Sequence, residues 1–315
     1  VTIKGTPTIS ANGEVIHAFT WSNSNKTDGE WAEAGNYINV SGGTYNKQFN
    51  EAYLAADCTL VTNSEGGYTV DQKKVAEYNG TQYTSLAQAV LDANKAGGTV
   101  KLLDNVTLTS SLGIGGTAAV TLNLNKKTLT LNGAQIYTQG SATVTINNGT
   151  IKRIDTPTSG SANNFAIQVM NGSTLLLGGS MVSDKVTLES TYGVYNYGGL
   201  LNVQYADITT DGWSIAVHDS QNNIGKVIIG NVGTAKITSQ NGNCIGTAVN
   251  TRPNVTIHKG TLTSNGTDWN AGPIYWASEG TLTINGGTFT ASSAEGSTAA
   301  AVYQKNGTLK ISGVT

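Results

Sequence analysis

The chain has 315 residues, of which 38% are hydrophobic and only 12% carry charge, with a formal net charge of −2 at pH 7. An ordinary soluble domain has about 25% charged residues, whereas a disordered chain combines low hydrophobicity with high net charge, so this composition excludes a disordered polymer. Arginine occurs only at Arg153 and Arg252 and the lysines are scattered, so the chain lacks the basic footprint of a nucleic-acid-binding protein. We therefore predict no nucleic-acid partner and, because the sequence has no long apolar run, no membrane insertion.

The first 72 residues have the pattern expected of the last coils of a parallel β-helix. Two apolar-x-apolar motifs end in glycine, at residues 1–5 and 38–43. A short helix is expected at residues 50–56, followed by a hairpin over residues 59–70 that turns where asparagine and glycine gather. We assign residues 1–72 to the terminal coils and the C-terminal cap of a preceding β-helix repeat.

Residues 73–98 are predicted to form a hairpin and an N-terminal cap helix. The Asn79-Gly80 pair is typical of a two-residue hairpin turn. An amphipathic helix is expected at residues 85–96, with a hydroxyl residue as its N-cap and two glycines at its end. Such a helix would cover the strand edges that the first coil of a β-helix exposes.

The remainder, residues 99–315, is repetitive. An apolar-x-apolar motif recurs at intervals of 22 to 31 residues, and it starts at Leu122, Val144, Leu175, Leu201, Val227, Val255, Leu282 and Leu309. A second apolar segment comes shortly before the next start, as at Val194, Ile274 and Val302. Alternation points one set of side chains inward and the next outward, and so short a repeat buries its apolar face only by stacking on its neighbours.

These elements predict an all-β fold, a right-handed parallel β-helix solenoid with a short capping helix and hairpin. A sandwich would show hairpin turns about every 8–12 residues and a propeller a repeat of about 40, and neither pattern is present. Residues 309–313 match residues 38–42, which suggests one repeat of a tandem array cut out of phase, with a unit of 271 residues (309 minus 38). Residues 1–72 would then cover an open C-terminal end in the same molecule or in a neighbour, which allows head-to-tail self-association.

The chain resembles a family of surface proteins in the stretches Ile38-Asn-Val-Ser-Gly-Gly-Thr-Tyr45 to Tyr68-Thr-Val70, and Tyr83-Thr-Ser-Leu-Ala-Gln-Ala-Val90 to Thr128-Leu-Thr-Leu-Asn-Gly133. It is similar there to the adhesin-like surface proteins of gut Gram-positive bacteria, which string together β-helix modules of pectate-lyase-like fold. The resemblance covers nearly the whole chain, but its motifs are structural and no functional residue carries over. It implies a protein that is secreted, on the cell surface or attached to the cell wall. Its expected partner is a host surface protein, such as an immunoglobulin or a mucin glycoprotein, or a glycan.

A catalytic site is not predicted. Polysaccharide lyases and hydrolases of this fold need clustered carboxylates and a base. The best candidates here are Asp184, Glu189, Asp207, Asp211, His218 and Asp219. They are expected on different edges of the coils, with both arginines distant from them. His17, His218 and His258 have no second ligand at metal spacing, so we expect neither a metal nor a cofactor.

The two cysteines, Cys58 and Cys244, lie far apart in the sequence. We expect two buried thiols that act as small hydrophobic residues. A single long-range disulfide is the alternative, because a disulfide framework needs more cysteines at closer spacing.

Outward aromatic residues are the predicted binding surface. If Val194, Ile274 and Val302 point inward, the residues that follow them point outward in one column. With their neighbours on the same strands, the candidate ligand-binding residues are Tyr195, Tyr197, Trp213, Tyr275, Trp276 and Tyr303. Flat aromatic faces suit sugar rings and protein hot spots alike, whereas the alternative is a surface ladder that only stiffens the sheet.

We therefore expect a non-catalytic, adhesin-like cell-surface module that binds a host protein or glycan through an elongated β-helix face. Two alternatives stay open. One is a structural stalk repeat that projects other domains, and the other is a carbohydrate-active polysaccharide lyase or hydrolase.

Overall fold

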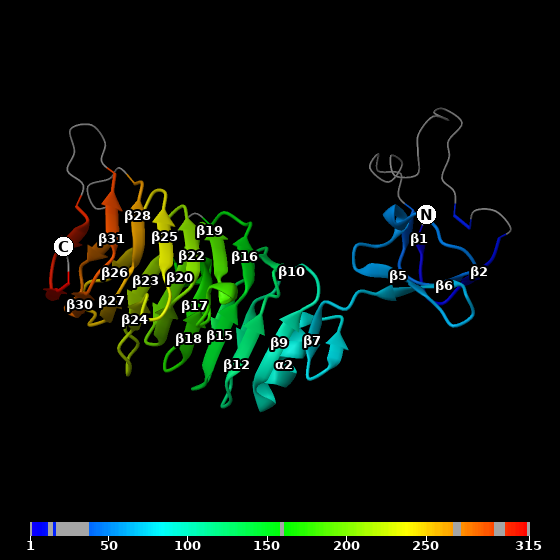
Figure 1. The fold of residues 1–315 in the computed structure, drawn as a ribbon, viewed down its shortest axis with the longest axis horizontal. Coiled ribbons are helices and arrows are strands. Elements are labelled where there is room, and N and C mark those ends of the chain that lie inside the picture. Colours follow the sequence, from blue (N-terminus) through cyan, green and yellow to red (C-terminus); the bar gives the residue numbers. More distant parts are fainter. Residues whose placement is uncertain are drawn as a thin grey trace. The chain divides into compact units, whose positions relative to one another are not determined.

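The computed structural model describes residues 2–11, 15–16, 38–157, 161–266, 272–292 and 300–313. It divides the chain into two compact units, residues 1–74 and residues 75–315 (Figure 1). The boundary predicted from the sequence lay between residues 72 and 73. No helix among the described residues is both long and apolar enough to cross a membrane.

The N-terminal unit contains two stacked coils that end in an antiparallel hairpin. Its elements are β1 (Thr2–Ile3), β2 (Thr8–Ile9), β3 (Asn39–Val40), β4 (Thr44–Tyr45), the 3-10 turn η1 (Glu51–Tyr53), β5 (Cys58–Thr62) and β6 (Tyr68–Gln72). Strand β1 pairs in parallel with β3, and β2 pairs in parallel with β4. Strand β6 then pairs antiparallel with both β4 and β5, so the parallel stack stops at this hairpin.

The C-terminal unit is a parallel β-helix of three sheets. The first sheet consists of β10 (Val106–Leu108), β13 (Thr128–Leu131), β16 (Gly149–Arg153), β19 (Val186–Ser190), β22 (Ala206–Thr210), β25 (Ala235–Ser239), β28 (Gly260–Ser264) and β31 (Thr288–Ala291). The second consists of β11 (Leu112–Ile114), β14 (Ile136–Thr138), β17 (Phe165–Val169), β20 (Tyr192–Tyr197), β23 (Ile215–His218), β26 (Ile245–Thr247), β29 (Ile274–Trp276) and β32 (Val302–Gln304).

The third sheet is the longest because a hairpin extends it. In spatial order it consists of β8 (Thr81–Tyr83), β7 (Ala76–Tyr78), β9 (Gly98–Leu102), β12 (Val120–Asn123), β15 (Thr143–Asn147), β18 (Thr174–Leu177), β21 (Leu200–Val203), β24 (Lys226–Ile229), β27 (Asn254–Ile257), β30 (Thr281–Ile284) and β33 (Thr308–Ile311). Strands β7 and β8 are antiparallel, and Asn79 and Gly80 between them have φ angles of 49° and 75°, as the predicted Asn-Gly turn requires.

The register confirms the predicted repeat. The eight motif starts lie in one column of the third sheet, each paired with the next, from Leu122 through Val144 to Leu309. The second apolar segments form a column of their own in the second sheet, in which Val194 pairs with Ile215 and Ile274 with Val302. The sequence period is therefore the length of one coil.

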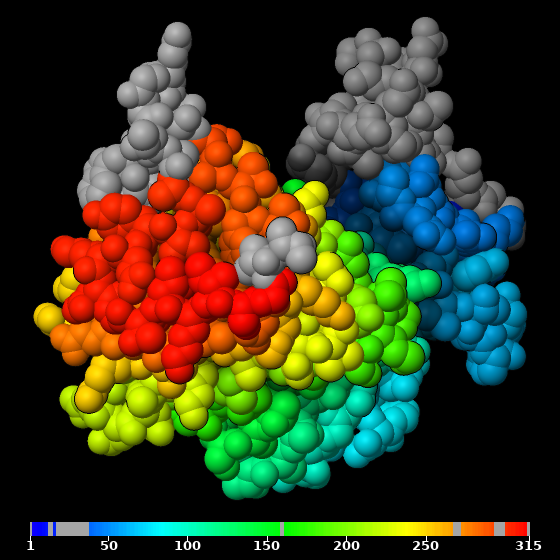
Figure 2. Space-filling view, turned by 60° about the vertical axis from the view of Figure 1, so that its left-hand side comes forward, coloured from blue at the N-terminus to red at the C-terminus, as the bar shows by residue number. Residues whose placement is uncertain are grey.

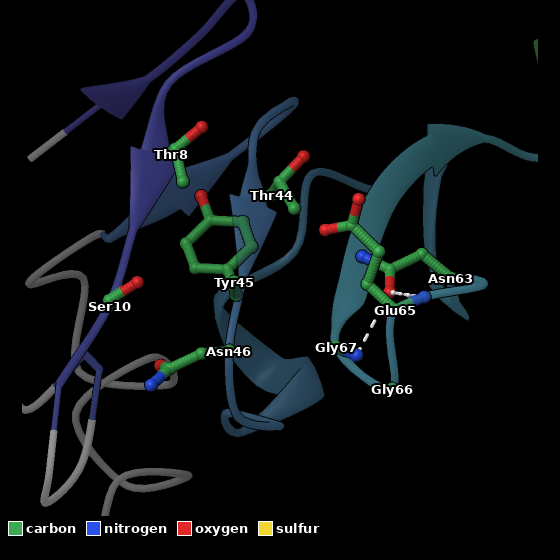
Figure 3. Close-up of a pocket in the computed structure, with 9 residues that line it drawn as sticks. All are labelled: Thr8, Ser10, Thr44, Tyr45, Asn46, Asn63, Glu65, Gly66 and Gly67. Atoms are coloured by element: carbon green, nitrogen blue, oxygen red, sulfur yellow. Dashed lines mark hydrogen bonds between the residues drawn. The ribbon is translucent and has the colours of Figure 1, made fainter.

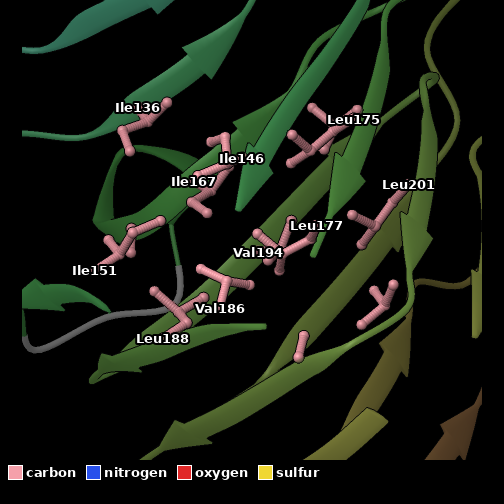
Figure 4. Close-up of a cluster of buried hydrophobic side chains, with 14 of the residues drawn as sticks. Ile136, Ile146, Ile151, Ile167, Leu175, Leu177, Val186, Leu188, Val194 and Leu201 are labelled. Carbon is pink, nitrogen blue, oxygen red and sulfur yellow. The ribbon is translucent and has the colours of Figure 1, made fainter. Parts of the chain in front are cut away.

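The core is the interior that these three sheets enclose. Figure 4 shows Ile146, Leu175, Leu188 and Val194 pointing toward one another from strands of all three sheets. All four side chains are fully buried. Burying a side chain of this size stabilises the fold by about 1.5–3 kcal/mol, and the inward column repeats in every coil.

One inward position differs from the prediction. The sequence pattern placed Met181 in the first-sheet column after Ile151, but the structure pairs Ile151 with Leu188. Met181 is 61% exposed and precedes the 3-10 turn η3 (Val182–Asp184). The longest coil uses its extra residues for this surface excursion, and its strand starts only at Val186.

A helix covers the N-terminal end of the β-helix as predicted. Helix α2 (Leu86–Ala96) starts at the N-cap Ser85, whose hydroxyl accepts a hydrogen bond from the Gln88 amide, and it ends at Gly97 with φ 77°. Its apolar face belongs to the main core. The side chain of Asn94 also donates to the Gly113 carbonyl at 3.0 Å and accepts from the Gly115 amide at 2.8 Å, so an amide side chain pairs with the edge strand β11.

Candidate functional site

The candidate site is a column of outward side chains on the second sheet, which we call the aromatic column. Successive strands pair so that one residue of each lies in this column: Tyr137, Gln168, Tyr195, Ala216, Gly246, Tyr275 and Tyr303. Neighbouring strands lie about 4.8 Å apart, so the column runs along the β-helix as a narrow stripe.

Tyr275 and Tyr303 form the most regular part of the column. Their ring centroids are 5.3 Å apart and their planes differ by 5°. Both side chains are partly exposed. Two stacked rings with one open face are the arrangement on which a sugar ring or an apolar side chain can pack.

A tryptophan occupies the gap in the middle of the column. The two small residues Ala216 and Gly246 leave room there, and a Cβ added to Gly246 would lie 3.7 Å from the Trp213 indole. Trp213 is 37% exposed, so its ring lies against the sheet while part of it faces solvent. The prediction included Trp213 but missed the two small residues, although an Ala and a Gly at outward positions of consecutive strands are visible in the sequence.

Tyr195 is the centre of an aromatic cluster. Its ring centroid lies 5.4 Å from that of Phe165, 6.3 Å from Tyr197 and 4.9 Å from His218. Burial raises the pKa of the Tyr195 phenol. Burial also lowers the pKa of the His218 imidazole, against the opposing effect of Asp219. The cluster therefore favours uncharged rings, which suits contact with flat, weakly polar surfaces.

Trp276 does not belong to the binding surface, and its assignment as a ligand contact is wrong. It is fully buried and part of the main core. The reason is the alternation of strand β29: Ile274 points inward, Tyr275 outward and Trp276 inward again. Two adjacent residues of one strand cannot share a face. The other five candidates, Tyr195, Tyr197, Trp213, Tyr275 and Tyr303, are partly or well exposed.

No protein-family model, curated protein or solved structure matches the chain.

The carboxylates considered for catalysis are dispersed, and several have partners of their own. Asp207 accepts an ion pair from Lys185 at 2.5 Å, and Glu189 lies 3.7 Å from Lys152. Asp219 accepts hydrogen bonds from the backbone amides of two loop residues. The described parts of the chain hold no group of three His, Cys, Asp or Glu side chains placed to bind a metal. His17 lies outside the described residues.

Both cysteines are free thiols, and they lie in different units. Burial raises the pKa of Cys244 to about 12, against two hydrogen bonds that lower it. Burial is also the main cause that raises the pKa of Cys58, assisted by Asp57. Both behave as buried hydrophobic residues, as one of the two sequence readings expected.

Two hollows occur outside the aromatic column. One, of about 180 Å³ in the N-terminal unit, is lined by hydroxyl and amide residues around Tyr45 (Figure 3). The Asn63 side chain in its wall already accepts hydrogen bonds from the Glu65 and Gly67 amides. The other, of about 340 Å³, lies beside Gly198 and Lys226 in the C-terminal unit. Both are shallow and largely satisfied by their own loops, so neither is stronger than the aromatic column.

Proposed function

We propose that this chain is a non-catalytic binding module that holds a host protein or a glycan along the aromatic column. The observation that carries the proposal is the alignment of partly exposed rings from distant parts of the sequence, Tyr195, Trp213, Tyr275 and Tyr303, on one sheet face. Aromatic residues are enriched at binding hot spots because they bury a large area at low entropic cost.

The shape of the surface supports a long ligand. The column extends over seven strands, from Tyr137 to Tyr303, while the hollows are small. A glycan chain or an extended protein surface can contact several rings at once, and weak contacts then add by multivalency. A small cofactor-like ligand would instead need a concave, enclosed site.

The cell-surface setting is part of the proposal and follows from the resemblance to adhesin-like proteins of gut Gram-positive bacteria. On this proposal the module is secreted, displayed on the cell surface or attached to the cell wall. Its partners are host surface proteins, such as immunoglobulins or mucin glycoproteins, or glycans.

The test is a binding screen of the full chain against immobilised glycans, immunoglobulins and mucin glycoproteins. The expected result is binding that Tyr275→Ala and Tyr195→Ala each weaken by roughly tenfold, as expected for the loss of a hot-spot ring. The matched controls are Thr238→Ala and Thr263→Ala, which remove side chains from the outward face of the first sheet. Binding that the tyrosine and threonine variants weaken equally would refute the proposed site.

A structural stalk is the second candidate, and one observation favours it. Tyr275 and Tyr303 stack on each other, and cross-strand pairs of this kind stabilise a sheet without any ligand. A stalk predicts that no probe binds and that Tyr275→Ala lowers the melting temperature only. Turnover of acidic or neutral polysaccharides in the same screen would instead establish the carbohydrate-active enzyme.

A further inference from the structure

The C-terminal end of the β-helix exposes apolar residues that are buried one coil earlier. Ile311 is 57% exposed, whereas its neighbour Ile284 in the same column is 3% exposed. Leu309 is likewise only half-buried, while Leu282 beneath it is fully buried. Figure 2 shows this last coil, in red, on the near face of the molecule. The N-terminal end is different, because helix α2 covers it.

Strand β33 also presents a free hydrogen-bonding edge. The amides of Thr308 and Ser312 donate to carbonyls of the preceding coil, at 2.9 Å and 2.8 Å. Alternate residues of a strand point their amides to opposite sides, so the backbone groups of Leu309 and Ile311 face away from β30. Among the described residues, β33 pairs with β30 alone.

The N-terminal unit has the complementary edge. Strand β1 pairs with β3 alone among the described residues, and the Ser41 amide donates to the Ile3 carbonyl at 2.9 Å. This bond repeats the one between Ser312 and Ile284 in the last coil. The backbone groups of Thr2 and Lys4 therefore face away from β3, on the side where a preceding coil would lie.

The sequences of the two edges match as well. Residues 38–45 (Ile-Asn-Val-Ser-Gly-Gly-Thr-Tyr) follow the same pattern as residues 282–289 (Leu-Thr-Ile-Asn-Gly-Gly-Thr-Phe). The two coils of the N-terminal unit thus have the local shape of the last coils of the β-helix. The antiparallel hairpin of β5 and β6 then ends the stack, as a C-terminal cap must.

We propose that residues 2–72 of one copy of this chain stack on the last coil of a second copy. Strand β1 of the first copy adds in parallel to the free edge of β33 in the second, with Ile3 beside Ile311. The Lys4 amide then donates to the Ile311 carbonyl, and the exposed side chains of Leu309 and Ile311 become buried. This is strand addition at a sheet edge, in which backbone hydrogen bonds supply affinity and the inward side chains fix the register.

The polarity of the two edges makes the contact head-to-tail. Each copy then keeps one unused edge of each kind, so association produces an open series of dimers, trimers and longer chains rather than a closed pair. The contact uses the ends of the stack and leaves the aromatic column free, so it is independent of the proposed ligand binding.

The experiment is sedimentation velocity of the full chain over a wide concentration range. Wild type is expected to form a concentration-dependent series built on the 32.6 kDa monomer. Ile311→Pro removes an amide that faces the free edge, and Lys4→Pro does the same on β1; each is expected to weaken association roughly tenfold or more. Lys310→Thr and Lys4→Ser are the matched controls, because they keep both edges, and they should associate like wild type.

A mixture of the two proline variants gives the sharpest result. Ile311→Pro retains a good β1 edge and Lys4→Pro retains a good β33 edge, so the mixture should form one-to-one dimers and nothing larger. Circular dichroism and the melting temperature should match wild type in both variants, which excludes misfolding as the cause. A wild type that stays monomeric at all concentrations would overturn the proposal, and so would a mixture that stays monomeric while wild type associates.

Discussion

Replacing Trp276 with alanine tests the assignment of this residue to the core. The side chain is fully buried inside the coil, whereas its neighbour Tyr275 lies outside on the same strand. Removing a buried Trp costs about 3–5 kcal/mol, because the transfer free energy is lost and a cavity remains. That is a large part of the about 5–15 kcal/mol by which a folded protein is stable.

Tyr275→Ala is the matched comparison. It removes a partly exposed ring and the stacking with Tyr303, which is worth about 0.5–1.5 kcal/mol beyond area burial. The cost of Trp276→Ala should therefore exceed that of Tyr275→Ala by about 2 kcal/mol or more. Because a solenoid is held together by nearest-neighbour interfaces, the loss should concentrate in the terminal coils.

The assay combines urea unfolding, followed by circular dichroism, with native-state hydrogen exchange of strands β29 to β33. We expect Trp276→Ala to expose these strands at lower urea than Tyr275→Ala does, and Trp276→Phe to recover part of the difference. Equal costs for the two alanine variants, or a cost for Trp276→Ala below about 1 kcal/mol, would refute the inward placement of the indole.

Three further predictions follow from local contacts. The pKa of His218 is lowered by burial, so the unfolded chain takes up a proton more readily. Stability should then be complete well above pH 6.5 and fall on acidification, and His218→Gln should flatten this dependence in melting experiments. Cys244, with a pKa of about 12, should not react with a thiol reagent at pH 8 in the folded protein but should react in urea; rapid reaction of the folded protein would contradict its burial. Gly246→Ala should be neutral or stabilising by about 0.4–1 kcal/mol, since its Cβ makes ordinary contact with Trp213. Gly193→Ala places a Cβ 2.3 Å from the Ser214 carbonyl oxygen and should cost about 1–3 kcal/mol in urea unfolding; equal stability of the two variants would contradict the register.

The sequence predicted the coil register well because two constraints act at every repeat. An apolar-x-apolar motif must face inward, and a glycine-rich corner must follow it, so Leu282 and Leu309 align without reference to the structure. The cap helix was equally visible, since its hydroxyl N-cap and terminal glycines enclose an amphipathic segment.

What the sequence could not predict depends on contacts between coils of unequal length. Met181 looks like an inward residue because it is apolar and follows a glycine turn, yet the long coil around it leaves the core column and returns only at Val186. The gap in the aromatic column is a tertiary feature of the same kind. Ala216 and Gly246 come from strands nearly thirty residues apart, and only their pairing shows that Trp213 has room there.

The central claim is that parallel stacking aligns Tyr137, Tyr275 and Tyr303 in one column, and pulsed electron paramagnetic resonance tests it most directly. Spin labels would be attached to Tyr137→Cys with Tyr275→Cys, and to Tyr137→Cys with Tyr303→Cys, while the buried native thiols stay unlabelled. Five coil steps separate the first pair and six the second, so the distances should be about 24 Å and about 29 Å at about 4.8 Å per step. Two distances that do not differ by about one strand spacing would contradict the parallel register and, with it, the aromatic column.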